Sequence, residues 1–202
     1  MGRPRAATAI ADTANQMLNV AERLIQTRGF NGFSYADIAA KLGVRKASLH
    51  YHFATKALLG VALIERYTTQ FQAALDAIAK ETADSFESLR RYVALYADVL
   101  RGGRMCLCGM LAAEYSTLPP PMQSGIRGFF DLSERWLTVI LERGRGAGQL
   151  AFAGTAVEAA QSLVGALEGS MLLARPYGEV ARFTVAAERL LAGLGPRTVS
   201  PH

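Results

Sequence analysis

Apolar residues recur at helical spacing along most of this chain, and that periodicity constrains the fold more than any other feature. Between Ile10 and Ile25 they form a single stripe at intervals of three and four residues, which is the repeat of one helix face. No stretch sustains the alternation of apolar and polar residues, rich in β-branched side chains, that a half-buried strand shows. The sequence therefore predicts an all-α fold.

Residues that cap or break helices divide the chain into about nine helical segments. Asp84 and Thr155, each followed by a glutamate three residues later, are typical N-caps. The Leu-Pro-Pro-Pro run at 118–121 is expected to lie outside any helix, because proline interrupts a helix interior. We expect helices near residues 10–28, 35–42, 45–51, 56–78, 85–100, 106–116, 122–145, 156–175 and 180–194.

The long helix that begins near Lys56 is expected to bridge two domains, a module of residues 1–55 and a larger domain of residues 56–202. Residues 1–56 carry eight Lys or Arg and three Asp or Glu, whereas the rest of the chain carries fourteen of each. A small module that binds a polyanion would show this distribution. Charge alone is equally consistent with a solvated basic face.

Two short helices joined by a tight turn at Gly43 describe a helix-turn-helix, whose second helix can enter the major groove of DNA. Residues 33–59, FSYADIAAKLGVRKASLHYHFATKALL, resemble the signature of the TetR family of repressors. The resemblance implies a three-helix DNA-binding module followed by a helical domain that dimerises and binds a small-molecule inducer.

The side chains left outward on the expected recognition helix are rich in hydrogen-bond donors. Arginine and lysine can pair with guanine edges or phosphates, and a tyrosine ring can pack on the groove wall. Residues at helix N-termini are expected to hold phosphates, and a basic N-terminal arm is expected to reach the minor groove. The candidate DNA-binding residues are Arg45, Lys46, Ser48, His50, Tyr51 and His52 on the recognition helix, Ser34, Tyr35 and Lys56 at phosphates, and Arg3 and Arg5 on the arm.

Other functional classes find little support in the sequence. His50 and His52 are interpreted as surface packing residues, because no cysteine or acidic cluster completes a metal site. We expect no metal and no other cofactor. An enzyme with Glu114 or Cys106 as its reactive group is an alternative, but no nucleophile and base pair or phosphate loop supports it. An activator, or a DNA-binding protein that ignores ligands, also stays open.

The segment RMCLCGMLAAEY, residues 104–115, resembles one in a TetR subgroup, some of whose members sense reactive electrophiles or small unsaturated acids. A cysteine at a helix N-terminus near Arg101 and Arg104 would hold more thiolate, the form that attacks electrophiles. The alternative is that these cysteines and the nearby aromatic residues are ordinary core. The candidate ligand-binding or sensing residues are Cys106, Cys108, Met110, Tyr92, Tyr96, Phe130 and Trp136.

The last two helices are expected to pair with those of a second copy in a homodimer. No apolar run approaches the length of a membrane-spanning helix, and the N-terminus lacks the apolar core of a secretory signal. We therefore expect a cytoplasmic protein whose partners are operator DNA, an inducer and its own second copy. The expected interface residues are Leu163, Val164, Leu167, Met171 and Leu172, with Gly165 and Gly169 permitting close approach.

Overall fold

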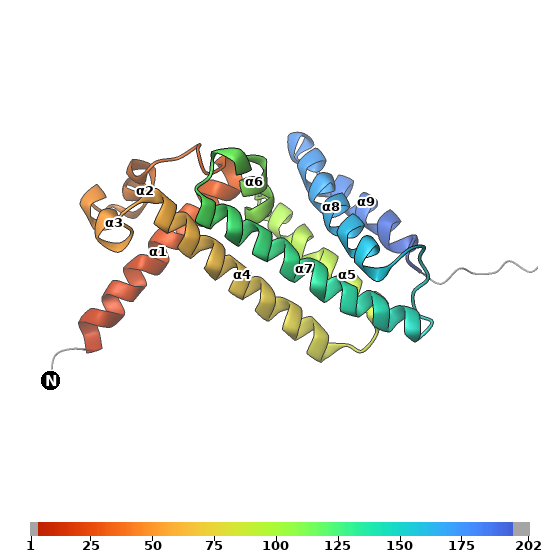
Figure 1. Cartoon of the computed structure of the whole chain (residues 1–202). Coiled ribbons are helices and arrows are strands. Elements are labelled where there is room, and N and C mark those ends of the chain that lie inside the picture. Colours follow the sequence, from red (N-terminus) through yellow and green to blue (C-terminus); the bar gives the residue numbers. More distant parts are fainter. Residues whose placement is uncertain (1–3, 196–202) are drawn as a thin grey trace, which may run out of the picture. The chain divides into compact units, whose positions relative to one another are not determined.

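The computed structural model describes residues 4–195, with side chains from residue 12 onward. Within that range the chain forms nine α-helices, two short 3₁₀ turns and no strand (Figure 1), which confirms the predicted all-α fold. No helix in the described range is long and apolar enough to cross a membrane. The helices are α1 (Pro4–Arg28), α2 (Tyr35–Leu42), α3 (Lys46–His52), α4 (Lys56–Glu81), α5 (Ser85–Arg101), α6 (Leu107–Ala113), α7 (Pro120–Gly146), α8 (Ala156–Ala174) and α9 (Val180–Ala192).

The predicted caps form where the sequence placed them. The Asp84 side chain accepts a hydrogen bond from the Glu87 backbone N–H at 2.8 Å at the start of α5. At the start of α8, Thr155 Oγ1 accepts from the Glu158 N–H at 3.1 Å, and the Glu158 carboxylate accepts from the Thr155 N–H at 2.8 Å. These bonds satisfy amide groups that a helix N-terminus otherwise leaves unpaired.

Two predicted boundaries around the proline run were wrong. Helix α7 begins at Pro120, so part of the run lies inside a helix. Proline is tolerated there because first-turn N–H groups have no intrahelical partner, and the Pro119 carbonyl accepts from the Met122 N–H at 2.9 Å. Helix α6 ends at Ala113 instead of continuing to residue 116, and a 3₁₀ turn follows at Tyr115–Thr117.

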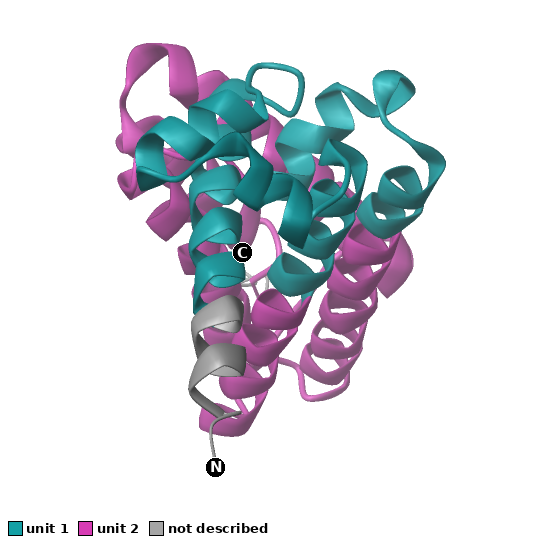
Figure 2. Cartoon of the chain, turned by 90° about the vertical axis from the view of Figure 1, so that its left-hand side faces the viewer, with its two compact units in different colours: residues 1–68, 107–127 teal, residues 69–106, 128–202 magenta. Residues whose placement is uncertain are grey.

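The chain divides into two compact units, which Figure 2 shows in different colours. Unit 1 comprises residues 1–68 and 107–127, and unit 2 comprises residues 69–106 and 128–202. Helices α4 and α7 each contribute residues to both units. The predicted functional boundary after residue 55 stays a prediction, since these units are defined by packing.

Unit 1 has a core made by the apolar face of α1 and the helices around it. Met17 and Ile25 of α1, Ile38 of α2 and Leu49 of α3 are at most 1% exposed. Gly60 of α4 lies so close to its neighbours that a Cβ atom there would come within 2.6 Å of the Met122 side chain. A larger residue at this position would therefore require the end of the Met122 side chain to shift.

Unit 2 has a core in which α8 and α9 pack closely together. Leu163, Val164, Leu167 and Met171 of α8 are buried within their own chain, whereas Leu172 is 56% exposed. The prediction that the first four reach a second copy was therefore wrong. Helical spacing identifies an apolar stripe, but it does not say whether the stripe covers the chain's own core or a partner.

Candidate nucleic-acid interface and ligand site

Helix α3 is positioned by the turn that precedes it and by its one fully buried side chain. Gly43 adopts the left-handed conformation, with φ 66° and ψ 28°, and its N–H donates to the Ala39 carbonyl. This conformation strains residues that carry a Cβ. Leu49 is 0% exposed, and it fixes the rotation of α3 so that the opposite side of the helix is left open.

The open side of α3 carries the cationic and aromatic residues that the sequence assigned to DNA. Arg45, Lys46, His50 and Tyr51 are exposed, and Ser48 and His52 are half-buried. Tyr51 is 76% exposed, which is unusual for a large aromatic side chain. An exposed aromatic ring among basic side chains is typical of a surface that contacts nucleic acid.

Ser34 is the N-cap of α2 and shares a small polar network with Asp37. The Asp37 carboxylate accepts from the Ser34 Oγ–H at 2.7 Å and from the Ser34 N–H at 2.8 Å. These bonds, with Ser34 Oγ the largest contributor, lower the pKa of Asp37. Ser34 is exposed, so it can still accept a hydrogen bond.

Tyr35 is placed differently from the predicted phosphate contact. The side chain is 5% exposed, and its hydroxyl donates to the Phe53 carbonyl at 2.8 Å. Its ring also packs against His50, with centroids 4.8 Å apart. Burial raises the pKa of Tyr35 to about 12. Tyr35 therefore holds the two ends of the α2 and α3 pair together.

Lys56 also has partners inside unit 1. Its Nζ donates to the Phe30 and Phe33 carbonyls, at 2.5 Å each. The ammonium group lies 4.5 Å and 4.2 Å from the centroids of the same two rings, which adds cation–π attraction. Burial lowers the pKa of Lys56, and the nearby Glu114 carboxylate acts in the opposite direction. This lysine fixes the connection between α1 and α2.

Glu114 holds that connection from the other side. Its carboxylate accepts from the Phe30 N–H at 2.5 Å and from the Asn31 N–H at 3.2 Å. Gly29, with φ 82°, allows the close approach, because a Cβ there would lie 2.9 Å from Glu114 Oε1. The sequence analysis considered Glu114 only as the reactive group of an enzyme, an alternative that found no support. No local signal could have revealed this contact, which spans more than eighty residues.

Glu114→Ala is expected to lower the free energy of unfolding by about 2 kcal/mol, because it leaves two backbone N–H groups without their charged acceptor. Urea denaturation followed by circular dichroism would measure the change. Glu142→Ala is the matched control, since Glu142 is an exposed glutamate of α7. Equal stability of the two variants would show that the Glu114 contacts do not hold the α1–α2 connection.

The remaining members of the predicted DNA set cannot be placed. Arg3 lies outside the described residues, and the side chain of Arg5 does as well. Within the described range, no group of three or more His, Cys, Asp or Glu side chains is arranged to hold a metal ion.

The predicted ligand-site residues fall into both compact units. Tyr92, Tyr96, Cys106, Phe130 and Trp136 belong to unit 2, and Cys108 and Met110 belong to unit 1. Both cysteines are buried, and Met110 and Phe130 are half-buried. Cys106 immediately precedes α6, and Arg101 is paired with Asp98 of its own helix.

Unit 2 contains an aromatic cluster whose two buried tyrosines belong to a chain of hydroxyl groups. The Tyr92 hydroxyl lies 3.0 Å from the Tyr96 hydroxyl and 2.5 Å from Ser133 Oγ. Trp136 stacks on Tyr92 with centroids 5.7 Å apart, and Phe71 lies edge-on to both tyrosines. Burial raises the pKa of both tyrosines, so they stay protonated near neutral pH. The structure therefore brings together three of the predicted ligand-site residues.

Glu168 of α8 is a half-buried acid, with an enclosed Oε1 atom, that the sequence analysis missed. Its carboxylate forms a hydrogen bond with the Cys106 thiol. Its negative charge contributes to the raised pKa of Tyr92 and Tyr96. Burial raises the pKa of Glu168 to about 7. A lone glutamate among apolar helix positions was the available signal, because an acid on a core-facing stripe is rarely structural.

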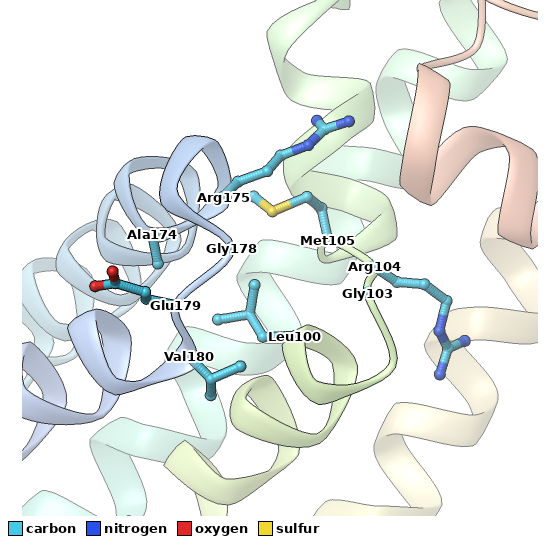
Figure 3. A pocket seen from close by; sticks show the side chains of 9 residues that line it. All are labelled: Leu100, Gly103, Arg104, Met105, Ala174, Arg175, Gly178, Glu179 and Val180. Carbon is cyan, nitrogen blue, oxygen red and sulfur yellow. The ribbon is translucent and has the colours of Figure 1, made fainter.

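A small hollow lies between the α5–α6 loop and the α8–α9 loop of unit 2 (Figure 3). Its volume is about 160 Å³. Leu100 and Val180 point into it, and the guanidinium groups of Arg104 and Arg175 point away. The hollow therefore has an apolar interior, and Met105, the chain neighbour of Cys106, lies on its wall.

The comparisons with known proteins agree on one family. A family model described as "Bacterial regulatory proteins, tetR family" matches residues 17–63. A TetR-family transcriptional regulator from Agrobacterium tumefaciens is 33% identical, with a TM-score of 0.89 over 92% of this chain and 99% of that one. A TetR transcriptional regulator from Legionella pneumophila is 31% identical, with a TM-score of 0.82 over 90% and 97% of the two chains.

A similar protein also carries a functional name. The HTH-type transcriptional repressor NemR of Escherichia coli (strain K12) is 29% identical over 174 residues, which cover 81% of this chain and 84% of NemR. The crystal structure of the reduced form of E. coli NemR has a TM-score of 0.78 at 25% identity, over 92% of this chain and 100% of that one.

Proposed function

This chain belongs to the TetR family of bacterial transcriptional regulators, which are not enzymes, and we propose that two copies of it hold an operator until a small electrophilic inducer releases them. The proposal assigns DNA binding to residues 1–55, and ligand binding and dimerisation to residues 56–202. It places the protein in the cytoplasm, where bacterial operator DNA is found.

The exposed face of α3 is the observation that carries the proposal. Arg45 and Lys46 offer donors for guanine edges or phosphates, and the Tyr51 ring can pack on a thymine methyl or the sugar wall of the groove. Ser48, His50 and His52 complete the reading surface. Because Tyr35 and Lys56 already bind backbone carbonyls of unit 1, we assign them to holding the module in shape.

The outer side of α8 supports assembly with a second copy. This α8 face is made of Val157, Gln161, Gly165, Gly169, Leu172 and Leu173, all exposed. Leu172 and Leu173 are 56% and 72% exposed. A Cβ atom at Gly165 or Gly169 would meet nothing in this chain, although glycine inside a helix costs about 1 kcal/mol relative to alanine. A second copy packed on this face would account for both glycines and both leucines.

Such a dimer explains how a short recognition helix achieves specificity. A twofold dimer presents two copies of α3, which fit successive major grooves of a near-palindromic site when they lie about 34 Å apart. An inducer that favours a different spacing would weaken operator binding, by a coupling free energy of about 1–3 kcal/mol.

Chain continuity offers a route for that coupling. Cys106 is the last residue before α6, and Glu114 at the other end of α6 binds the Phe30 and Asn31 amides. A change at the cysteine would therefore move the helix whose far end holds the α1–α2 connection. The likeness to NemR supports a repressor of this kind, since that protein is named a repressor and has a described reduced form.

Lys46→Ala and Tyr51→Ala are each expected to weaken operator binding by about 1–3 kcal/mol, because each removes a groove contact without disturbing the core. The measurement is fluorescence anisotropy on a duplex that the wild-type protein has selected from a random-sequence library. The control is Lys80→Ala, which removes an exposed lysine at the end of α4.

Wild-type affinity in both variants would remove α3 from the interface. Failure of the wild-type protein to enrich any duplex at moderate salt would overturn the DNA-binding proposal as a whole.

A further inference from the structure

Buried Cys106 and half-buried Glu168 form a pair in unit 2 that operator binding does not use. Cys106 is 3% exposed, and its thiol forms a hydrogen bond with the Glu168 carboxylate. Glu168 Oε1 is enclosed, and it has no hydrogen-bond partner among the described residues. A buried carboxylate oxygen without a donor is costly, so a purely structural role does not explain why an acid stands here.

The other polar groups near Glu168 cannot take a proton from the thiol. Within the part of the chain whose side chains are described, Glu168 interacts with the Cys106 thiol and with the hydroxyl groups of Tyr92 and Tyr96 of α5. Both tyrosines keep their protons at neutral pH, since burial raises the pKa of each. The Glu168 carboxylate is therefore the proton acceptor for Cys106 within this cluster.

We propose that Glu168 is the general base that takes the Cys106 proton when the sulfur adds to an α,β-unsaturated carbonyl inducer. This inference rests on the proposed response to electrophiles. The sulfur forms a bond to the β-carbon while the electron pair of the C=C bond moves toward the carbonyl oxygen, giving an enolate. The thiol proton passes to Glu168 and then to the α-carbon. The product is a thioether, and no oxidant or reductant is consumed.

The electrostatics of the pair suit this step. Proton transfer is most effective when the pKa of the base lies near the working pH, and burial has raised the pKa of Glu168 to about 7. An ordinary glutamate, with a pKa near 4.5, would be a much weaker base toward a thiol.

The hollow beside Met105 has room for a small molecule near the pair. Its volume of about 160 Å³ is close to that of an engineered apolar cavity of about 150 Å³ that holds benzene. Met105 precedes Cys106 directly, and Ala174 of the same wall lies on the helix that carries Glu168. A short enone or enal therefore fits this approach better than a long-chain one.

The test is the rate of Cys106 alkylation by 2-cyclohexen-1-one, followed by intact-mass and peptide-mapping mass spectrometry between pH 5.5 and 8.5. The wild-type rate should rise through about pH 7 as Glu168 loses its proton. Glu168→Gln keeps the shape of the side chain but is no base, so its rate at pH 7.5 should fall about 100-fold. Its profile should then lack the step near pH 7. Glu168→Asp should recover part of the rate.

Two controls separate this inference from the proposed function. Glu188→Gln changes an exposed glutamate of α9 and should leave the rate unchanged. Cys106→Ser should abolish both the alkylation and the enone-driven release of the selected duplex. If Glu168→Gln reacts at the wild-type rate while Cys106→Ser does not respond, Glu168 is not the base, and the electrophile response stands. If the enone neither modifies wild-type Cys106 nor releases the duplex, the electrophilic inducer class and this inference both fail.

Discussion

Leu173→Glu is expected to convert the protein to monomers and to weaken operator binding by about 10²–10⁴-fold, the advantage that linking two binding modules typically brings. Leu173 is 72% exposed on the α8 face, beside the stripe that contains Gly165 and Gly169. In the proposed twofold dimer, a carboxylate here would lie unpaired in the interface. Sedimentation equilibrium would measure the association, and anisotropy on the selected duplex would measure binding.

Ala77→Glu is the matched control for this variant, because it adds a carboxylate at an exposed position of α4. It should leave both association and DNA binding at wild-type values. A Leu173→Glu protein that still sediments as a dimer would exclude the α8 face as the interface.

Lys56→Met is expected to lower the free energy of unfolding by about 3 kcal/mol. The methionine can fill the space of the aliphatic stem between Phe30 and Phe33. It cannot donate to their carbonyls, and each charge-assisted hydrogen bond contributes about 1.5–3 kcal/mol. Urea denaturation would measure the loss, with Lys41→Met, an exposed lysine of α2, as the control.

The same variant distinguishes the two roles considered for this lysine. If Lys56 bound a DNA phosphate, its removal would lower the slope of log affinity against log salt concentration by about one. The free energy of unfolding would then stay unchanged. Unchanged stability with a reduced slope would restore the phosphate contact predicted from the sequence. A loss of stability supports the assignment made from the Phe30 and Phe33 carbonyls.

Local features of the fold could be predicted because their physical causes are local. The caps at Asp84 and Thr155 depend on residues three positions apart, and the turn at Gly43 depends on one residue's backbone conformation. The start of α7 at Pro120 was missed because proline was treated as a breaker at every position, whereas it is compatible with the first turn of a helix.

The candidate sites could be predicted only where a motif or an outward face identifies them. The helix-turn-helix spacing alone predicts which residues lie on the exposed side of α3. The roles of Lys56, Glu114 and Glu168 could not be predicted, since each depends on partners brought close by tertiary packing. Helical spacing also could not distinguish Leu167, which is buried in its own chain, from Leu173, which is exposed.

The hydrogen bonds from the Phe30 and Asn31 amides to Glu114 limit how the DNA-binding module can be fused to another protein. Residues 107–127 belong to the same compact unit as the first 68 residues. A chimaera that joins residues 1–55 to the ligand-binding part of another regulator would lose both Glu114 and Lys56. A chimaera designed to respond to a new inducer would therefore have to include the α6 segment together with the DNA-binding module.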